Sequence, residues 1–266
     1  MLKRFRIVGL CLVAIFALSA VGASSAMAEH LEVGKCKSVA KTGKWEDSKC
    51  TKALAEGNFE WEALPAGAKV PFTSVSGEKK LYAGGTLKIT CKKDKNVGEL
   101  TGPTTDTVQV TFEECTAESG VATCKSIKPG APAGGAGIII TNTLESKLSW
   151  LKRAAPMTVG LDLAPPSGTL FTEILCEALG GLIKENVKVG GSVIGEIIPL
   201  NTMTTKFELK FECVSGKQKY TKDENEPTDT LTVSLKGGAP VEGCEEEVTP
   251  DKIETTQTVE VWAAFP

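Results

Sequence analysis

Apolar and polar side chains alternate with a period of two along much of the chain, and this pattern restricts the fold most. The clearest runs are residues 107–112, 158–163, 230–235 and 258–261. Successive side chains of a strand point to opposite faces, so this alternation, rich in valine and threonine, indicates half-buried antiparallel strands. Glycine pairs such as Gly84-Gly85 and Gly237-Gly238 separate them. About a dozen such strands predict an all-β protein, an antiparallel β-sandwich with a partly open β-barrel as the alternative.

One stretch, residues 171–184, fits two kinds of secondary structure. Its sequence is FTEILCEALGGLIK, in which apolar residues recur at helical spacing, yet Phe171 to Cys176 also fits a buried strand. Gly180-Gly181 weakens a long helix. We therefore predict a strand followed by a loop or a short helical turn.

The first 28 residues are predicted to be a secretory signal peptide. Lys3, Arg4 and Arg6 form a basic start, an apolar run covers residues 7–21, and Ala26-Met27-Ala28 is a small-residue cleavage signal. Residues 29–66 are predicted to form a small N-terminal appendage tied by a disulfide, and residues 67–266 the β-rich domain. The expected localisation is extracellular or cell-envelope associated.

Eight cysteines remain after Cys11 of the signal peptide is removed. An even number of cysteines in an exported chain, with no CxxC and no nearby histidine, predicts disulfides rather than a metal site. Proximity in the sequence favours Cys36–Cys50 and Cys115–Cys124 as short loops. The other two predicted pairs are Cys91–Cys176 and Cys213–Cys244.

Several segments together resemble a group of uncharacterised secreted bacterial β-rich proteins with no assigned function. They are GNFEW, TLKITC followed by VGELTG, VTFEEC, VGLDLAPPSGTLFTEILC and GGSVIGEIIPLN, and they span most of the chain after the signal peptide. The shared motifs are patterns of hydrophobic residues and glycine. The resemblance implies secretion and a single β-rich unit, and it carries over no catalytic residue.

The usual catalytic constellations are absent from the sequence. His30, the only histidine, lies next to the new N-terminus, which disfavours a Ser-His-acid triad or a zinc hydrolase. Neither GxSxG nor a phosphate-binding GxxxxGK[ST] occurs. The S-x-x-K pattern occurs at Ser38/Lys41, Ser76/Lys79 and Ser149/Lys152, close to the number expected by chance, and the SDN partner motif is missing. We predict no catalytic residue and no cofactor.

Acidic residues supply the remaining chemical alternatives. The pairs Glu113/Glu114, Glu173/Glu177 and Glu208/Glu212 lie near predicted strand ends and could hydrolyse a polysaccharide, although a solvated sheet face explains them more simply. Residues 222–229 and Glu245-Glu246-Glu247 with Asp251 could hold calcium. We interpret both stretches as exposed acidic turns and predict no metal site.

Composition limits the partners of the protein. Without the signal peptide, 27 basic and 33 acidic residues leave a net charge of −6, and Arg153 is the only arginine. Such a surface disfavours nucleic acid, because phosphate binding depends on basic clusters. No second apolar run is long enough to span a membrane. We predict a secreted, disulfide-stabilised, non-enzymatic binding or structural protein; the alternative is a secreted polysaccharide hydrolase. The sequence leaves the partner open, with an envelope polysaccharide or a protein as candidates.

Overall fold

A computed structural model describes residues 29–85, 87–117, 120–127, 133–167, 170–220 and 230–265. The expected signal peptide, residues 1–28, lies outside the described residues. Leu31–Ala263 forms one compact unit, and the description below concerns that unit. Its secondary structure is almost entirely antiparallel strand.

Eight strands of the larger sheet form a closed circuit, because β16 at one end of the order also pairs with β21. In circuit order these are β16 (Thr204–Lys210), β15 (Val193–Ile198), β12 (Thr158–Ala164), β11 (Leu144–Lys152), β7 (Thr105–Glu113), β6 (Lys93–Leu100), β3 (Val70–Ser76) and β21 (Asp251–Ala264). The order continues outside the circuit from β21 to β1 (His30–Trp45) and β2 (Ala53–Ala63), and β10 (Ile138–Ile140) pairs with β7.

The second sheet is also closed and has eight strands. In order these are β13 (Thr172–Ala178), β14 (Ile183–Gly191), β19 (Leu231–Leu235), β20 (Val241–Glu247), β4 (Lys79–Ala83), β5 (Leu87–Cys91), β8 (Thr116–Ala117) and β9 (Ala122–Ile127). A short 3-10 turn, η2 (Leu179–Gly181), links β13 to β14, and β17 (Cys213–Val214) and β18 (Lys217–Gln218) form a separate hairpin.

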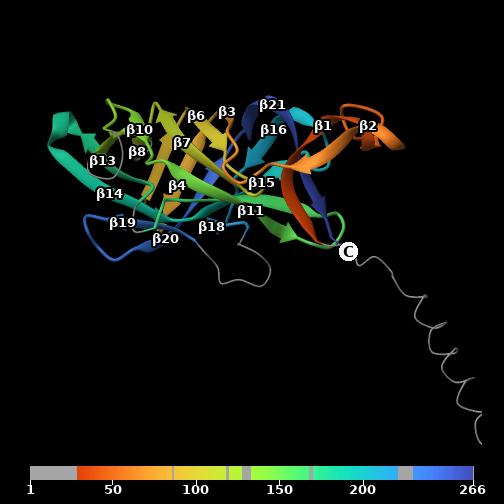
Figure 1. Ribbon diagram of the computed structural model, residues 1–266. Coiled ribbons are helices and arrows are strands. Elements are labelled where there is room, and N and C mark those ends of the chain that lie inside the picture. Colours follow the sequence, from red (N-terminus) through yellow and green to blue (C-terminus); the bar gives the residue numbers. More distant parts are fainter. Residues whose placement is uncertain are drawn as a thin grey trace, which may run out of the picture. The chain divides into compact units, whose positions relative to one another are not determined.

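The two barrels are successive stretches of the same bent strands. Connections of one to three residues lead from β3 to β4, β5 to β6, β7 to β8, β14 to β15 and β20 to β21. When the two circuits are aligned strand by strand, each of these connections joins a strand of one circuit to the strand at the corresponding position of the other. The barrels therefore adjoin end to end at one junction (Figure 1), and a single hydrophobic core cluster includes buried residues of both.

These observations confirm the predicted all-β, antiparallel fold. Both sheets close, which corresponds to the barrel alternative rather than to two open sheets. The alternating runs become β7, β12, β19 and part of β21, and their valines and leucines form the core. The ambiguous stretch is strand β13 followed by η2, as predicted.

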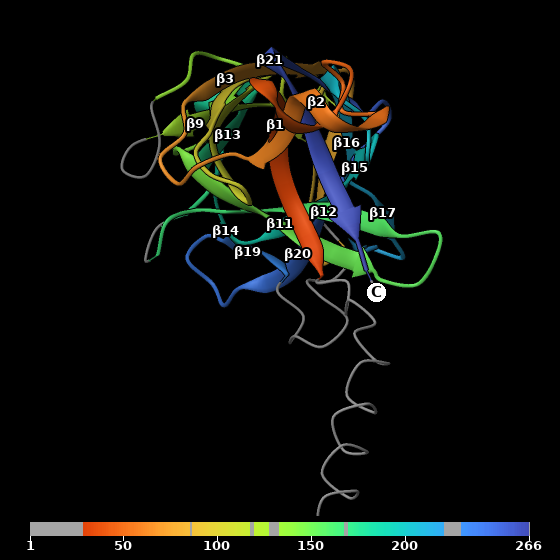
Figure 2. The ribbon, with the colours of Figure 1, turned by 45° about the vertical axis from the view of Figure 1, so that its right-hand side comes forward.

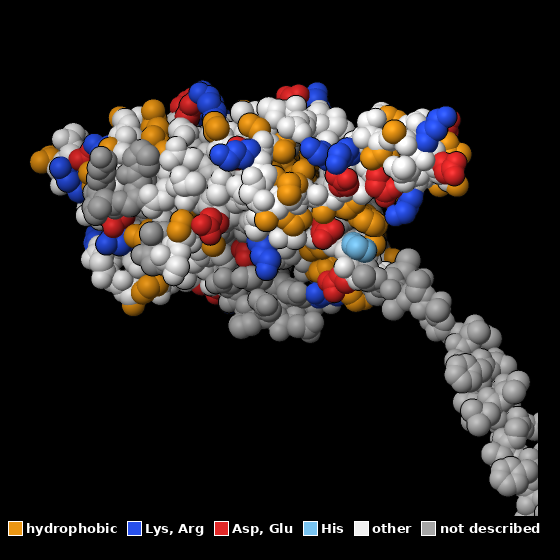
Figure 3. Space-filling model, in the orientation of Figure 1, with side chains coloured by type: hydrophobic (Ala, Val, Ile, Leu, Met, Phe, Trp, Pro, Cys, Tyr) orange, Lys and Arg blue, Asp and Glu red, His pale blue; other side chains and the backbone are white. Residues whose placement is uncertain are grey.

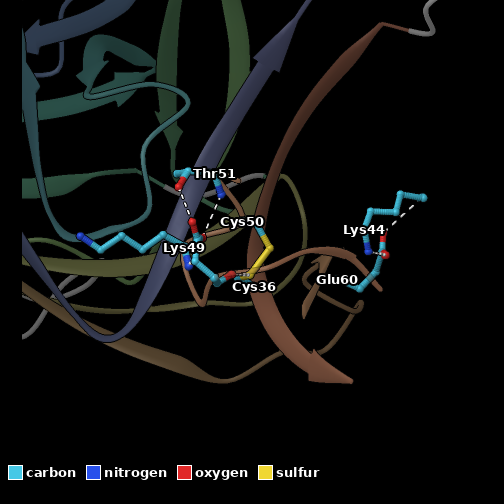
Figure 4. Close-up of a disulfide and its surroundings, with 7 residues drawn as sticks. Cys36, Lys44, Lys49, Cys50, Thr51 and Glu60 are labelled. Carbon is cyan, nitrogen blue, oxygen red and sulfur yellow. Dashed lines mark hydrogen bonds and ion pairs between the residues drawn. A yellow bond between two sulfur atoms is a disulfide. The ribbon is translucent and has the colours of Figure 1, made fainter. Parts of the chain in front are cut away.

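Residues 29–66 contribute the β1–β2 hairpin, which lies beside β21 (Figure 2). The Cys36–Cys50 disulfide ties β1 to the loop that precedes β2 (Figure 4). Asp47 orders this loop: one carboxylate oxygen accepts the backbone N–H groups of Lys49 and Thr51 at 3.0 Å, and the other accepts the Thr51 hydroxyl at 2.6 Å.

Four disulfides tie the unit, and two of the predicted pairings are wrong. Cys36–Cys50 and Cys213–Cys244 are paired as predicted. The structure joins Cys91 to Cys115 and Cys124 to Cys176 instead of Cys91 to Cys176 and Cys115 to Cys124. Cys124 and Cys176 are directly opposed on β9 and β13, so strand register, not distance along the chain, selects the partner.

Candidate functional site: a buried ion cluster beside an apolar cavity

A charged cluster lies where the strands pass from one barrel to the other. Lys79 is the first residue of β4, Asp94 is at the start of β6, Glu247 ends β20 and Asp251 begins β21. The side chains of these four residues are at most 5% exposed, and that of the fifth member, Glu245 on β20, is 16% exposed. Ion pairs at the junction thus connect Lys79 on β4 with Glu247 and Asp251, which are more than 150 residues away in the sequence.

The ammonium of Lys79 is the centre of the cluster. Its Nζ lies 2.8 Å from Asp94 Oδ2, 2.9 Å from Asp251 Oδ2 and 3.4 Å from Glu245 Oε1, and it donates to Glu247 Oε1. The rings of Phe211 and Phe112 flank it, with centroids 5.3 and 5.9 Å away. One buried ammonium therefore contacts four carboxyl groups.

This imbalance shifts the pKa of Lys79 and of three of the carboxyl groups, those of Asp94, Glu245 and Glu247. Burial by itself lowers the pKa of Lys79, but the surrounding carboxylates, Asp251 first, raise it well above its usual value. Burial raises the pKa of Asp94 to about 6 and that of Glu247 to about 9, against the opposing effect of Lys79. Burial also raises the pKa of Glu245. Protons on some of the carboxyl groups thus relieve their mutual repulsion.

Neighbouring polar groups hold the carboxylates in place. Asp94 Oδ1 accepts the backbone N–H of Ser76 at 2.9 Å, and Glu247 Oε2 accepts that of Phe211 at 3.2 Å. The Asn96 amide donates to Ser74 Oγ at 2.7 Å and to Asp251 Oδ1 at 3.3 Å. Because its Nδ2 faces these acceptors, Asn96 Oδ1 is left without a hydrogen-bond partner among the described residues, although the residue is only 4% exposed.

The interpretation of Glu245-Glu246-Glu247 and Asp251 as an exposed acidic turn is wrong. Glu247 and Asp251 are buried, because alternation along β20 and the start of β21 turn them into the barrel. Carboxylate oxygens of Asp94, Glu247 and Asp251 lie within 4.8 Å of one another. The Lys79 ammonium binds all three and so takes the position a metal ion would need. The other predicted acidic turn, residues 222–229, lies outside the described residues.

A cavity of about 100 Å³ lies beside the cluster. Residues of both barrels line it, among them Phe72, Val108, Ile139, Leu161, Ile174 and Val189. Its wall is mostly apolar, and Lys79, Asn96, Glu245 and Asp251 form a polar part of it. The volume is below that of a typical drug-sized pocket and near that of a protein cavity that binds benzene.

A second cavity of about 40 Å³ lies within the barrel that contains β7, and Asp106 on β7 lines both cavities. Asp106 is 4% exposed. Burial raises the pKa of its carboxyl group to about 6, and the nearby hydroxyl of Ser146 offsets part of the rise. A titratable group is therefore set into the wall between the two cavities.

The predicted carboxylate pairs lie elsewhere, and five of their six glutamates form ion pairs with lysine. Glu113 accepts Lys95 and Lys93, Glu177 accepts Lys125 and Lys184, and Glu212 accepts Lys210 and Lys219. Glu114 pairs with Lys92, Glu173 pairs with Lys188, and Glu208 is opposite Lys252 in the β16–β21 register.

Hydrogen bonds from these lysines lower the pKa of Glu113, Glu114, Glu177 and Glu212. A glycosidase acid needs the opposite shift. Serine–lysine chemistry at Ser76/Lys79 meets a similar obstacle, because the raised pKa of Lys79 keeps it protonated and unable to accept a proton.

Sequence reasoning considered Lys79 only within an S-x-x-K pattern, and it missed Asp94 and Asn96 altogether. A signal was available: Lys79 shares a strand face with Leu81 and Ala83, and Asp94 and Asn96 occupy alternate positions on β6. Polar residues at inward-facing positions of a strand indicate a buried polar group that must find partners. Those partners come from β20 and β21, far away in the sequence.

The chain was compared with protein-family models, curated proteins and solved structures, and nothing matches it. Among the described residues, no helix has the length and hydrophobicity needed to cross a bilayer.

Proposed function

We propose that the protein is a secreted, non-enzymatic binding protein of the extracellular space or cell envelope, and that it holds a compact apolar ligand in the cavity at the barrel junction. The observation that carries the proposal is the cavity itself, a mostly apolar space next to a fixed charged cluster. Binding sites commonly combine an apolar wall with a few oriented polar groups. Four disulfides support an oxidising compartment.

The size of the cavity limits the ligand to roughly one ring or a short branched hydrocarbon. Asn96 Oδ1 adds a chemical preference, since a buried acceptor without a partner is costly and an O–H or N–H group in the cavity would satisfy it. The proposed ligand therefore has a small apolar body and one hydrogen-bond donor. Phenol and toluene are suitable probes because they differ mainly in that donor.

The test measures thermal unfolding of the oxidised protein with each probe. At roughly ten times Kd a ligand stabilises the folded state by about 1.4 kcal/mol, which raises Tm by about 3 to 6 °C for a chain of this size. Phenol should raise Tm at lower concentration than toluene. Methyl NMR signals of Ile139 and Ile174, which line the cavity, should shift on addition of phenol.

Two variants make the test specific. Val108→Ile with Val189→Ile adds one methylene from each barrel, so it should weaken binding of both probes. Val75→Ile with Val97→Ile makes the same chemical change at exposed positions and should leave binding intact. If neither probe raises Tm or shifts the cavity methyl signals, the ligand-binding proposal fails and a purely structural role takes its place.

A further inference from the structure

The β13–β14 turn carries the densest group of exposed aliphatic side chains among the described residues. Leu179 is 68% exposed, Leu182 86% and Ile183 56%. Gly180 and Gly181 lie between the two leucines with positive φ, which produces a tight, projecting turn. Hydrophobic side chains stand out at the left end of the surface in Figure 3, where Figure 1 places this turn.

A neighbouring turn adds a fourth aliphatic residue. β9 pairs with β13 up to Thr123 opposite Glu177. Val121 lies two residues before Thr123 and Leu179 lies two residues after Glu177, so both are at the same end of the β9–β13 pair, and Val121 is 64% exposed. We call Val121, Leu179, Leu182 and Ile183 the apolar tip. Isolated exposed apolar residues are ordinary, but a contiguous group indicates a contact surface.

Two lysine–glutamate ion pairs lie on the strands that lead to the apolar tip, β13 and β14. Lys184 pairs with Glu177 at 3.2 Å, and its side chain is 59% exposed against 26% for the glutamate. Lys188 pairs with Glu173 at 3.1 Å, with exposures of 50% and 16%. The ammonium groups therefore face solvent while the carboxylates lie against the barrel, so an approaching surface meets positive charge first.

We propose that the apolar tip inserts into the interfacial region of an anionic lipid bilayer. Interfacial binding depends on apolar side chains that enter the headgroup boundary and on basic residues beside them that attract anionic lipid. A protein partner fits less well, since protein interfaces are enriched in Trp, Tyr and Arg and depleted in Lys. The tip contains aliphatic residues instead, and the ion pairs beside it use lysine and glutamate.

The experiment uses the protein that starts at Glu29, because it contains every strand that the structure describes and all four disulfides, and it lacks the apolar run of residues 7–21. Co-sedimentation with phosphatidylcholine vesicles, with and without phosphatidylglycerol, measures the partition coefficient. The wild-type protein should bind the anionic vesicles at least tenfold better than the neutral ones, and added salt should weaken the binding.

Paired variants identify the surface that binds. Leu179→Ser with Leu182→Ser should reduce the partition coefficient at least tenfold without changing Tm, because both side chains are already in solvent. Val75→Ser with Val97→Ser removes exposed apolar residues elsewhere and should change neither quantity. Relative to the wild-type protein with its four tryptophans, Leu182→Trp should add a blue-shifted emission on anionic vesicles that brominated lipid quenches, whereas Val97→Trp should add neither.

Three results would overturn the proposal. They are the absence of sedimentation with anionic vesicles, an equal loss of binding in both serine pairs, and full binding by the Leu179→Ser, Leu182→Ser variant. If the protein instead self-associates in sedimentation velocity, and the same variant abolishes this, the apolar tip is a protein contact.

Discussion

Replacing Asp106 with asparagine should remove one part of the pH dependence of the free energy of unfolding, the part that comes from this carboxyl group. The carboxyl group is buried on β7 between the two cavities, and its pKa is raised to about 6 from the ordinary value of 3.8. The folded protein thus retains this proton up to about pH 6, while the unfolded chain releases it near pH 4. Between these values the native state binds more protons, so the free energy of unfolding falls as pH rises.

The magnitude follows from the size of the pKa change. Each pKa unit corresponds to 1.36 kcal/mol, so Asp106 should cost about 3 kcal/mol of stability above pH 7 relative to pH 3. The asparagine introduced by Asp106→Asn would keep the shape of the side chain and carry no charge. The difference in unfolding free energy between Asp106→Asn and wild type should therefore shift in favour of the variant by about this amount as pH rises.

Urea unfolding of the oxidised proteins from pH 3 to pH 8, followed by intrinsic tryptophan fluorescence, to which the buried Trp150 contributes, measures this difference. Glu113→Gln on the same strand is the control with the opposite sign. Lys95 and Lys93 lower the pKa of Glu113, so its ion pairs stabilise the fold above pH 4.5 and are lost as pH falls further. A difference curve for Asp106→Asn that stays flat over this range would refute the reasoning, because it would show that folding does not perturb the carboxyl group.

Three further predictions concern stability. Lys79→Met should destabilise the fold by roughly 3 to 5 kcal/mol in urea unfolding, because it leaves buried carboxylates unpaired, whereas Lys80→Met, on the solvent side of β4, should cost much less. Cys124→Ser with Cys176→Ser should cost about 4 kcal/mol for a loop of 52 residues; peptide mapping that finds Cys115 joined to Cys124 would contradict the assigned pairing. Gly98→Ala should lower Tm, because its Cβ would lie 2.2 Å from the Phe72 ring and 2.5 Å from a backbone oxygen; an unchanged Tm would show that β6 can move aside.

The fold class could be predicted from the sequence because its signal is local. Alternation within β7 or β12 depends only on neighbouring residues, and it indicates which face is buried whichever strand lies alongside. The same holds for β13 and η2, where a buried strand ends at a glycine pair. The prediction that the cysteines form disulfides likewise needed only their even number and the expected oxidising compartment.

Tertiary structure decided the pairings and the site, because both depend on contacts between distant strands. Closure of the barrels rests on β9 meeting β13 and β16 meeting β21, and the first of these pairings also selects Cys176 as the partner of Cys124. Lys79 acquires its carboxylates only when β20 and β21 lie beside β4 and β6 at the junction. A charged residue on a core-facing strand position indicates that it needs partners, but strand register alone determines which residues supply them.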